Sequence, residues 1–106
     1  MKESDFQARL IRKLKTMLPG CIVLKNDPCY IQGFPDLTVL YGKHWAILEC
    51  KRSANAPRQP NQEYYVKLAG DMSFGRFVSP ENEEEVLRDI QQAFGVRGET
   101  LAAGSQ

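Results

Sequence analysis

The sequence contains few of the residues that build zinc sites or disulfide frameworks. It has one histidine, His44, and three cysteines, at positions 21, 29 and 50. No two cysteines have the two-residue spacing of a zinc knuckle, and their odd number does not make a complete set of disulfides. We therefore expect reduced thiols in an intracellular, cytoplasmic protein. His44 belongs to the turn signal Tyr41-Gly42-Lys43-His44, where we expect a solvated side chain and not a general base.

Long apolar segments are also missing. No apolar run approaches the roughly 20 residues that a membrane span needs, and Met1–Asp5 is polar with no secretory segment behind it. We therefore expect no membrane partner. The 106 residues, of which 42% are apolar and 25% charged, are typical of one soluble domain. We place that domain at residues 1–95 and expect residues 96–106, which lack periodicity, to form a flexible tail.

The net charge of +1 is small, but the charges are unevenly distributed. Residues 1–58 contain ten Lys and Arg against five Asp and Glu, whereas residues 59–106 contain four against eight. A chain polarised in this way can present a basic face to phosphate while staying near neutral overall. The cations between Arg9 and Lys15 are explained equally well as a solvated helix surface.

Apolar residues at helical spacing predict a first helix over residues 4–18, ended by Pro19-Gly20. Ser4 and Gln7 fit a capping box, which leaves Glu3 outside the helix. A start one turn earlier instead places Glu3 on the inward stripe, and the sequence does not choose between the two.

Two further helices and four strands are expected. A helix begins at Pro60, carries Gln62 on its inward stripe and ends at Gly70, and Ser79-Pro80 caps a last helix that Gly95 ends. Apolar and β-branched runs predict strands at residues 21–26, 37–41, 44–51 and 74–78. A three-strand meander, a crossover helix and a fourth strand give an α/β fold with a small mixed four-stranded sheet flanked by helices.

Two carboxylates lie at the ends of the predicted second and third strands. Asp36 precedes one strand and Glu49 lies near the end of the next, thirteen residues later and across a turn signal. An antiparallel hairpin brings these ends side by side. Carboxylates this close repel unless a cation lies between them. Their hard oxygen atoms suit Mg²⁺ or Mn²⁺, with the backbone carbonyl of Cys50 as a third ligand.

Lys51, two residues after Glu49, points to the same side of its strand. An ammonium group there would contact a scissile phosphate or orient the attacking water. The two carboxylates and this lysine therefore predict metal-assisted phosphodiester hydrolysis. Three further cations flank the site and are candidates for phosphate contacts: Lys25, Arg52 and Arg58.

Structural alternatives remain open for each of these residues. Asp36 is also explained as a turn residue, Glu49 and Lys51 as an exposed cross-strand pair, and Gln62 as an ordinary residue of a first helical turn. Three tyrosines either stack on unpaired bases or pack within the protein: Tyr30, Tyr64 and Tyr65.

Pro35-Asp36 together with Glu49-Cys50-Lys51 resembles the signature of the PD-(D/E)XK nuclease superfamily. The restriction-endonuclease-like αβββαβ core of that superfamily has the element order predicted above. More narrowly, Gly33–Leu37, Leu48–Lys51 and Gln62 resemble the virus-type replication-repair nuclease (VRR-NUC) domain, and the resemblance extends over residues 3–92.

The resemblance implies a role for each matching residue. Asp36 and Glu49 would bind the metal, Lys51 would be catalytic and Gln62 would support the active site. Glu3 matches the acidic residue that many members carry on the first helix, which implies a further metal ligand.

Stand-alone members of this family occur in phages, resemble Holliday junction resolvases and act as homodimers. The resemblance therefore implies a phage-encoded, Mg²⁺- or Mn²⁺-dependent endonuclease of DNA repair in a bacterial host. It would be a homodimer that cuts branched DNA, such as a four-way junction or a flap. The main alternative is a catalytically silent nucleic-acid-binding module of the same fold, and a protein-interaction subunit is a more remote one.

Overall fold

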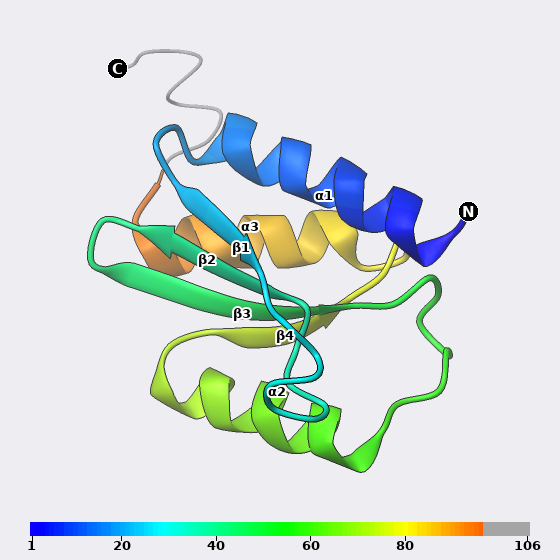
Figure 1. Ribbon diagram of the computed structural model, residues 1–106. Helices are drawn as coiled ribbons and strands as arrows, with labels where there is room; N and C mark the ends of the chain where they lie inside the picture. Colours follow the sequence, from blue (N-terminus) through cyan, green and yellow to red (C-terminus); the bar gives the residue numbers. More distant parts are fainter. Residues whose placement is uncertain (97–106) are drawn as a thin grey trace.

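The computed structural model describes residues 1–96. Its elements follow one another as α1 (Glu3–Met17), β1 (Ile22–Lys25), β2 (Leu37–Tyr41), β3 (His44–Cys50), α2 (Pro60–Met72), β4 (Gly75–Val78) and α3 (Glu83–Phe94) (Figure 1). The order is the predicted one, and each strand ends within one residue of its expected position. Apart from Val96, the tail expected at 96–106 lies outside the described residues, and the boundary at residue 95 stays a prediction. No helix within residues 1–96 is long and apolar enough to cross a bilayer.

The four strands form one mixed sheet in the order β1-β2-β3-β4. β1, β2 and β3 are antiparallel neighbours, and α2 carries the chain to β4, which runs parallel to β3. The turn between β2 and β3 contains Gly42 at a φ of 61°, a conformation that glycine adopts without strain. The predicted α/β class and mixed four-stranded sheet are confirmed.

The sheet lies between two layers of helix, with α1 and α3 on one face and α2 on the other (Figure 1). The alternation of side chains along β3 explains how both faces are covered. Leu48 and Cys50 point into the main core beneath α1 and α3, whereas Glu49 points toward α2. That core contains Phe6, Leu10 and Leu14 of α1, Leu37 and Val39 of β2, and Val86, Ile90 and Phe94 of α3.

α2 packs closely against β4 at two glycines. A Cβ atom on Gly75 would clash with the carbonyl oxygen of Val66 and lie 2.7 Å from the backbone nitrogen of Gly70. Gly70 therefore lies where the backbones of helix and strand meet, and the helix continues beyond it to Met72. The prediction that Gly70 ends this helix is wrong, because the glycine serves the contact with β4 and not the end of the helix.

α1 begins at Glu3, with Lys2 in the capping position and no side-chain cap. The backbone N–H of Phe6 donates to the carbonyl oxygen of Lys2 at 3.0 Å, and this bond extends the helix past the predicted start at Ser4. The capping box expected at Ser4 and Gln7 is therefore absent from α1. Glu3 occupies the first helical position.

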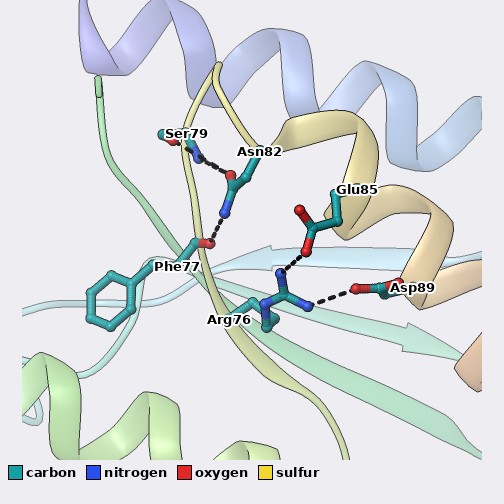
Figure 2. A network of polar contacts seen from close by, with 6 residues as sticks. All are labelled: Arg76, Phe77, Ser79, Asn82, Glu85 and Asp89. Atoms are coloured by element: carbon teal, nitrogen blue, oxygen red, sulfur yellow. Dashed lines mark hydrogen bonds and ion pairs between the residues drawn. The ribbon is translucent and has the colours of Figure 1, made fainter. Parts of the chain in front are cut away.

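α3 begins at Glu83, later than the predicted start at Ser79-Pro80. The side chain of Asn82 accepts the Ser79 backbone N–H at 2.8 Å and donates to the Phe77 carbonyl oxygen at 3.0 Å (Figure 2). These bonds hold residues 79–82 in a turn that comes before the helix. At the other end Gly95 has a φ of 72°, as expected for the predicted stop.

Side chains of β4 and β3 contact α3 at two places. The guanidinium of Arg76 on β4 bonds Asp89 at 2.8 Å and Glu85 at 3.2 Å, both on α3 (Figure 2). His44 is half-buried, with its ring 5.1 Å from that of Phe94. The expectation of a solvated turn residue is wrong for His44, because the tight turn at Gly42 already places it in β3 against α3.

Candidate active site

The hairpin of β2 and β3 brings Asp36 and Glu49 together. Leu37 pairs with Leu48 in the antiparallel register, so the next residue outward on each strand is Asp36 and Glu49 respectively. The backbone N–H of Asp36 donates to Oε1 of Glu49 at 3.1 Å, and the backbone N–H of Cys50 donates to Oδ2 of Asp36 at 2.9 Å. Each carboxylate is therefore held by the backbone of the opposite strand.

Gln62 on the first turn of α2 joins Glu49 to Lys51. Its Nε2 donates to Oε2 of Glu49 at 2.9 Å, and its Oε1 accepts from Nζ of Lys51 at 2.9 Å. Nζ of Lys51 also lies 3.7 Å from Oε2 of Glu49. This arrangement defines the orientation of the amide, because the opposite orientation would set the amide NH₂ against the ammonium.

The same amide also caps α2. Oε1 of Gln62 accepts the backbone N–H of Gln59 at 3.0 Å, which completes a reciprocal capping box between these two glutamines. The box forms because Gln62 stands three residues after the capping position, where its side chain can reach back. Gln62 thus starts the helix and positions Lys51 through one oxygen atom.

Burial raises the pKa of both carboxyl groups. Glu49 is only 3% exposed, and its burial, together with the charge of Asp36, raises its pKa to about 7 although Lys51 opposes the rise. Burial also raises the pKa of Asp36, against the Cys50 N–H and the Lys51 charge. Burial therefore disfavours the ionised form of both carboxyl groups, and a cation between them would relieve this cost.

Glu3 lies at the edge of this pair. Partial burial raises its pKa, and so does the charge of Asp36, while the charges of Lys51 and Arg52 lower it. Glu3 is therefore within electrostatic range of the pair. Within residues 1–96, however, no three His, Cys, Asp or Glu side chains group closely enough to hold a metal ion by themselves.

Cys50 contributes its backbone and not its thiol. The thiol is fully buried in the core beneath α1 and α3, and this burial raises its pKa, so it stays protonated. Its backbone N–H bonds Asp36, as described above. The carbonyl that the sequence suggested as a metal ligand remains a prediction.

The donor set fits a hard divalent cation. Mg²⁺ commonly binds through only one or two protein carboxylates and completes its coordination with water and substrate phosphate oxygens. Asp36 and Glu49 supply such a pair. Within residues 1–96 the hydrogen bonds to these side chains engage Oδ2 of Asp36 and both oxygens of Glu49, and leave Oδ1 of Asp36 for a ligand.

Arg58 lies on the Lys51 side of the site. Its guanidinium stacks over the ring of Phe77 with Cζ 3.9 Å from the ring centre. Lys51 and Arg58 both line a small hollow of about 40 Å³. Its other walls come from the loop after β3, from the end of β4 and from the turn before α3: Ser53, Ala54, Phe77, Val78, Ser79 and Asn82. The hollow therefore presents two cations on one side of the carboxylate pair.

The other predicted cations differ in their placement. Arg52 is exposed and near enough to Glu3 to lower its pKa. Lys25 pairs with Leu37, whose side chain is in the main core, so the register places Lys25 on the face of the sheet opposite to Glu49. The structure therefore brings Arg52 close to Glu3 and leaves Lys25 on the far face.

The basic cluster of α1 is partly engaged inside the protein. Arg9 Nη2 and Lys13 Nζ lie 3.0 and 3.2 Å from Oε1 of Glu83, which is 4% exposed. These two cations fix α1 against the start of α3. Arg9 and Lys13 are therefore neither free in solvent nor fully available to bind phosphate, because both are paired with Glu83.

Asn26 positions the backbone around Asp36, a role that no pattern in the sequence predicts. Its backbone N–H donates to the carbonyl oxygen of Asp36 at 2.7 Å, and its Nδ2 donates to the carbonyl oxygen of Pro35 at 2.9 Å. Its Oδ1 accepts from the hydroxyl of Thr38 at 3.0 Å. Asn26 therefore fixes the backbone that presents Asp36. No spacing pattern marks it, because its partners lie on a neighbouring strand.

Comparisons with known proteins agree with this arrangement. No protein-family model matches the sequence, and no curated protein matches it. A solved structure described as "VRR_NUC domain" aligns with a TM-score of 0.66 and 21% identity, over 81% of this chain and 94% of that one. A second, described as "VRR_NUC domain protein", aligns with a TM-score of 0.62 and 16% identity, over 91% of this chain and 90% of that one. The chain therefore has the fold of VRR_NUC domains, as the resemblance of its motifs implied.

Proposed function

We propose that the protein is a metal-dependent endodeoxyribonuclease of the VRR-NUC family within the PD-(D/E)XK superfamily. One observation carries the proposal: hydrogen bonds join Asp36 to Glu49, Glu49 to Gln62 and Gln62 to Lys51 at one end of the β2–β3 hairpin. Residues that are far apart in sequence and typical of phosphodiester hydrolysis thus share one site. The VRR_NUC fold supports the same conclusion.

Asp36 and Glu49 are the proposed ligands of Mg²⁺ or Mn²⁺. A bound divalent cation would supply Lewis acidity, since it lowers the pKa of a coordinated water and offsets the negative charge that develops on phosphate. Glu3 and the carbonyl of Cys50 are proposed as further ligands, with Glu3 acting through water. Substrate oxygens and water would complete the coordination, consistent with the two-carboxylate set.

Lys51 is the proposed catalytic cation. Its ammonium would donate to a non-bridging oxygen of the scissile phosphate and offset the charge gained in the transition state. Gln62 and Glu49 already hold this group in place, so little reorganisation is needed when substrate binds. Arg58 and Arg52 would bind neighbouring phosphates, and Lys25 would contact the backbone of DNA that extends past the sheet.

We further propose branched DNA as the substrate and a homodimer as the active form. One chain holds one site, so a pair of nicks at a four-way junction, as a Holliday junction resolvase makes, requires two copies related by a two-fold axis. The same site would act singly on a flap.

A catalytically silent DNA-binding module is the second candidate. One observation favours it, namely that Lys51 and Arg58 line one hollow, where they would bind phosphate whether or not the carboxylates hold a metal. Such a module would bind DNA through its cations without cleaving it, and its binding would weaken strongly with salt because phosphate contacts release counterions.

The test compares a labelled four-way junction with a matched linear duplex, in Mg²⁺, in Mn²⁺ and in EDTA. We expect metal-dependent cleavage that favours the junction. Asp36→Asn and Lys51→Met should each lower the rate by about 10²–10³. The matched controls Asp71→Asn and Lys67→Met, at side chains that are 65% and 80% exposed on α2, should leave it unchanged.

Each other outcome has a distinct meaning. Cleavage of both DNAs at equal rates would retain the nuclease and reject selectivity for branched DNA. Salt-sensitive binding without cleavage in either metal would reject the nuclease in favour of the silent module. Sedimentation of the protein with and without junction DNA would test the dimer independently.

A further inference from the structure

The loop between β1 and β2 forms an open cavity that the proposed cleavage site does not use. The cavity measures about 310 Å³, at the lower end of the sizes found for small-molecule sites. It is lined by Asn26, Asp27, Tyr30, Ile31 and Phe34. Its walls thus combine two aromatic rings and one aliphatic side chain with an amide and a carboxylate.

This cavity adjoins the segment that presents Asp36. Phe34 is two residues before Asp36, a separation that the chain spans in at most about 7 Å. The ring of Phe34 lies 5.2 Å from the ring of Tyr65, which stands three residues after Gln62 on α2. Asn26 bonds the backbone of both Pro35 and Asp36. A DNA strand whose phosphate lies at Asp36 would therefore pass the mouth of the cavity.

The chemistry of the lining points to a nucleobase. Tyr30 is 86% exposed, so a face of its ring is open for stacking, which is how proteins hold unpaired bases. None of the cations within residues 1–96 lines the cavity, and its described walls are therefore unsuited to phosphate. Oδ1 of Asp27 accepts the backbone N–H of Cys29 at 2.8 Å, and this bond fixes a carboxylate whose second oxygen can accept from a base edge.

We propose that this cavity receives one unpaired base of the DNA strand held at the active site. The base stacks on Tyr30, and Asp27 accepts a hydrogen bond from its exocyclic amino group. Cytosine, adenine and guanine carry such a group. Thymine offers only its ring N3–H, which lies between two carbonyl oxygens that repel the carboxylate, so thymine binds least well. The inference rests on the proposed nuclease function and narrows its substrate to DNA with an unpaired nucleotide beside the cleaved bond, as in a flap.

The experiment measures binding and cleavage separately on a duplex with a short single-stranded cytosine flap. Affinity is measured by fluorescence anisotropy in EDTA, and an abasic site is moved through each flap position in turn. We expect one position at which loss of the base weakens binding by roughly 5- to 100-fold, the range for one stacked base. Tyr30→Ala should weaken binding of the intact flap to a similar degree and should be insensitive to the abasic site.

Two variants serve as controls for Tyr30→Ala. Tyr30→Phe keeps the ring and should retain both the affinity and the sensitivity to the abasic site. Tyr64→Ala removes a tyrosine that is 61% exposed on α2 but does not line the cavity, and it should leave the abasic effect intact. The high exposure of Tyr30 means that its removal should not change the urea midpoint of unfolding.

Asp27→Asn tests the proposed base preference. At the sensitive position the wild type should bind cytosine several-fold more tightly than thymine, and the variant should lose or reverse that order, because its amide presents a donor to the carbonyl groups of thymine.

The outcomes separate this proposal from the nuclease itself. A flat abasic scan, or equal losses in Tyr30→Ala and Tyr64→Ala, would overturn the base pocket even if the flap is cut normally. A base-dependent interaction with Tyr30 in a protein that never cuts DNA would support the pocket and reject the nuclease. If Tyr30→Ala weakens the binding of intact and abasic flaps by the same factor, Tyr30 contacts the DNA backbone and not a base, and the base pocket is overturned.

Discussion

Replacing Glu49 by glutamine tests the electrostatics of the site directly. In the folded chain burial and the charge of Asp36 raise the pKa of Glu49 from 4.5 to about 7. Between these two pH values the folded protein therefore binds more protons than the unfolded chain. The free energy of unfolding must fall as the pH rises through this interval, because proton binding stabilises the folded state more than the unfolded chain and this stabilisation is lost as protons dissociate. The Glu49→Gln variant carries an amide that cannot ionise, so it should lack this contribution.

The size of the effect follows from the two pKa values. The interval from 4.5 to about 7 corresponds to about 3 kcal/mol of unfolding free energy, at about 1.4 kcal/mol per pH unit. A domain of this size has a total stability of about 5–15 kcal/mol, so the loss is large enough to measure. The amide of Glu49→Gln also offers one acceptor oxygen where the carboxylate offers two, and this lost hydrogen bond should lower stability by about 1–3 kcal/mol at every pH.

The assay is urea unfolding from about pH 5 to about pH 8, followed by the fluorescence of Trp45, the single tryptophan. In EDTA the wild type should lose about 3 kcal/mol more than Glu49→Gln over this range. The burial of Asp36 raises its pKa in both proteins and so cancels in the difference. Mg²⁺ should reduce the loss in the wild type, because it binds the ionised pair. Parallel pH profiles for the two proteins in EDTA would refute the reasoning.

Three further predictions concern the surroundings of the site. Gln62→Ala should lower the cleavage rate about 10–100-fold, as for other residues that orient catalytic groups. The control Gln59→Ala should lower the unfolding free energy by about 1 kcal/mol, because it weakens the cap of α2, and should leave the cleavage rate unchanged. Gly75→Ala should destabilise the protein by about 2 kcal/mol or more, because the added Cβ meets the backbone of α2. Gly20→Ala should destabilise it by only about 1 kcal/mol, because the space there is open and only the φ of 88° is unfavourable. Arg9→Met should lower the unfolding free energy by about 2 kcal/mol, because it removes one partner of buried Glu83, and Glu83→Gln in the same chain should recover part of that loss. Additive losses in this double-mutant cycle would contradict the proposed pairing.

Local patterns in the sequence were sufficient to predict the strands and their order. Each strand is a short apolar run bounded by turn residues, and the tight turn at Gly42 fixes the register of β2 against β3. That register alone is enough to place Asp36 beside Glu49. The strand geometry also places Lys51 on the side of Glu49, so three site residues follow from one hairpin.

Features that depend on contacts between distant segments could not be predicted in the same way. The start of α3 depends on Asn82 reaching back to Ser79 and Phe77, and the passage of α2 through Gly70 depends on Gly75 of β4. The role of Asn26 could not be predicted from the sequence, because its hydrogen-bond partners lie in and just before another strand. In each case the sequence permits several local conformations, and tertiary hydrogen bonds or close packing select one.

Gln62 shows why the proposed site and the fold cannot be separated here. Its Oε1 accepts from the backbone of Gln59 and from Nζ of Lys51, so the first turn of α2 and the placement of the ammonium depend on one atom. The ammonium carries three N–H groups, so a phosphate can bind one of them while Gln62 keeps its bond to Lys51 and Glu49 holds the amide nitrogen. Substrate binding at Lys51 would therefore be felt at the start of α2, which also carries Tyr65 against Phe34 beside the cavity. Through contacts that are already formed, the amide thus connects the charges of the candidate site to the wall of the neighbouring cavity.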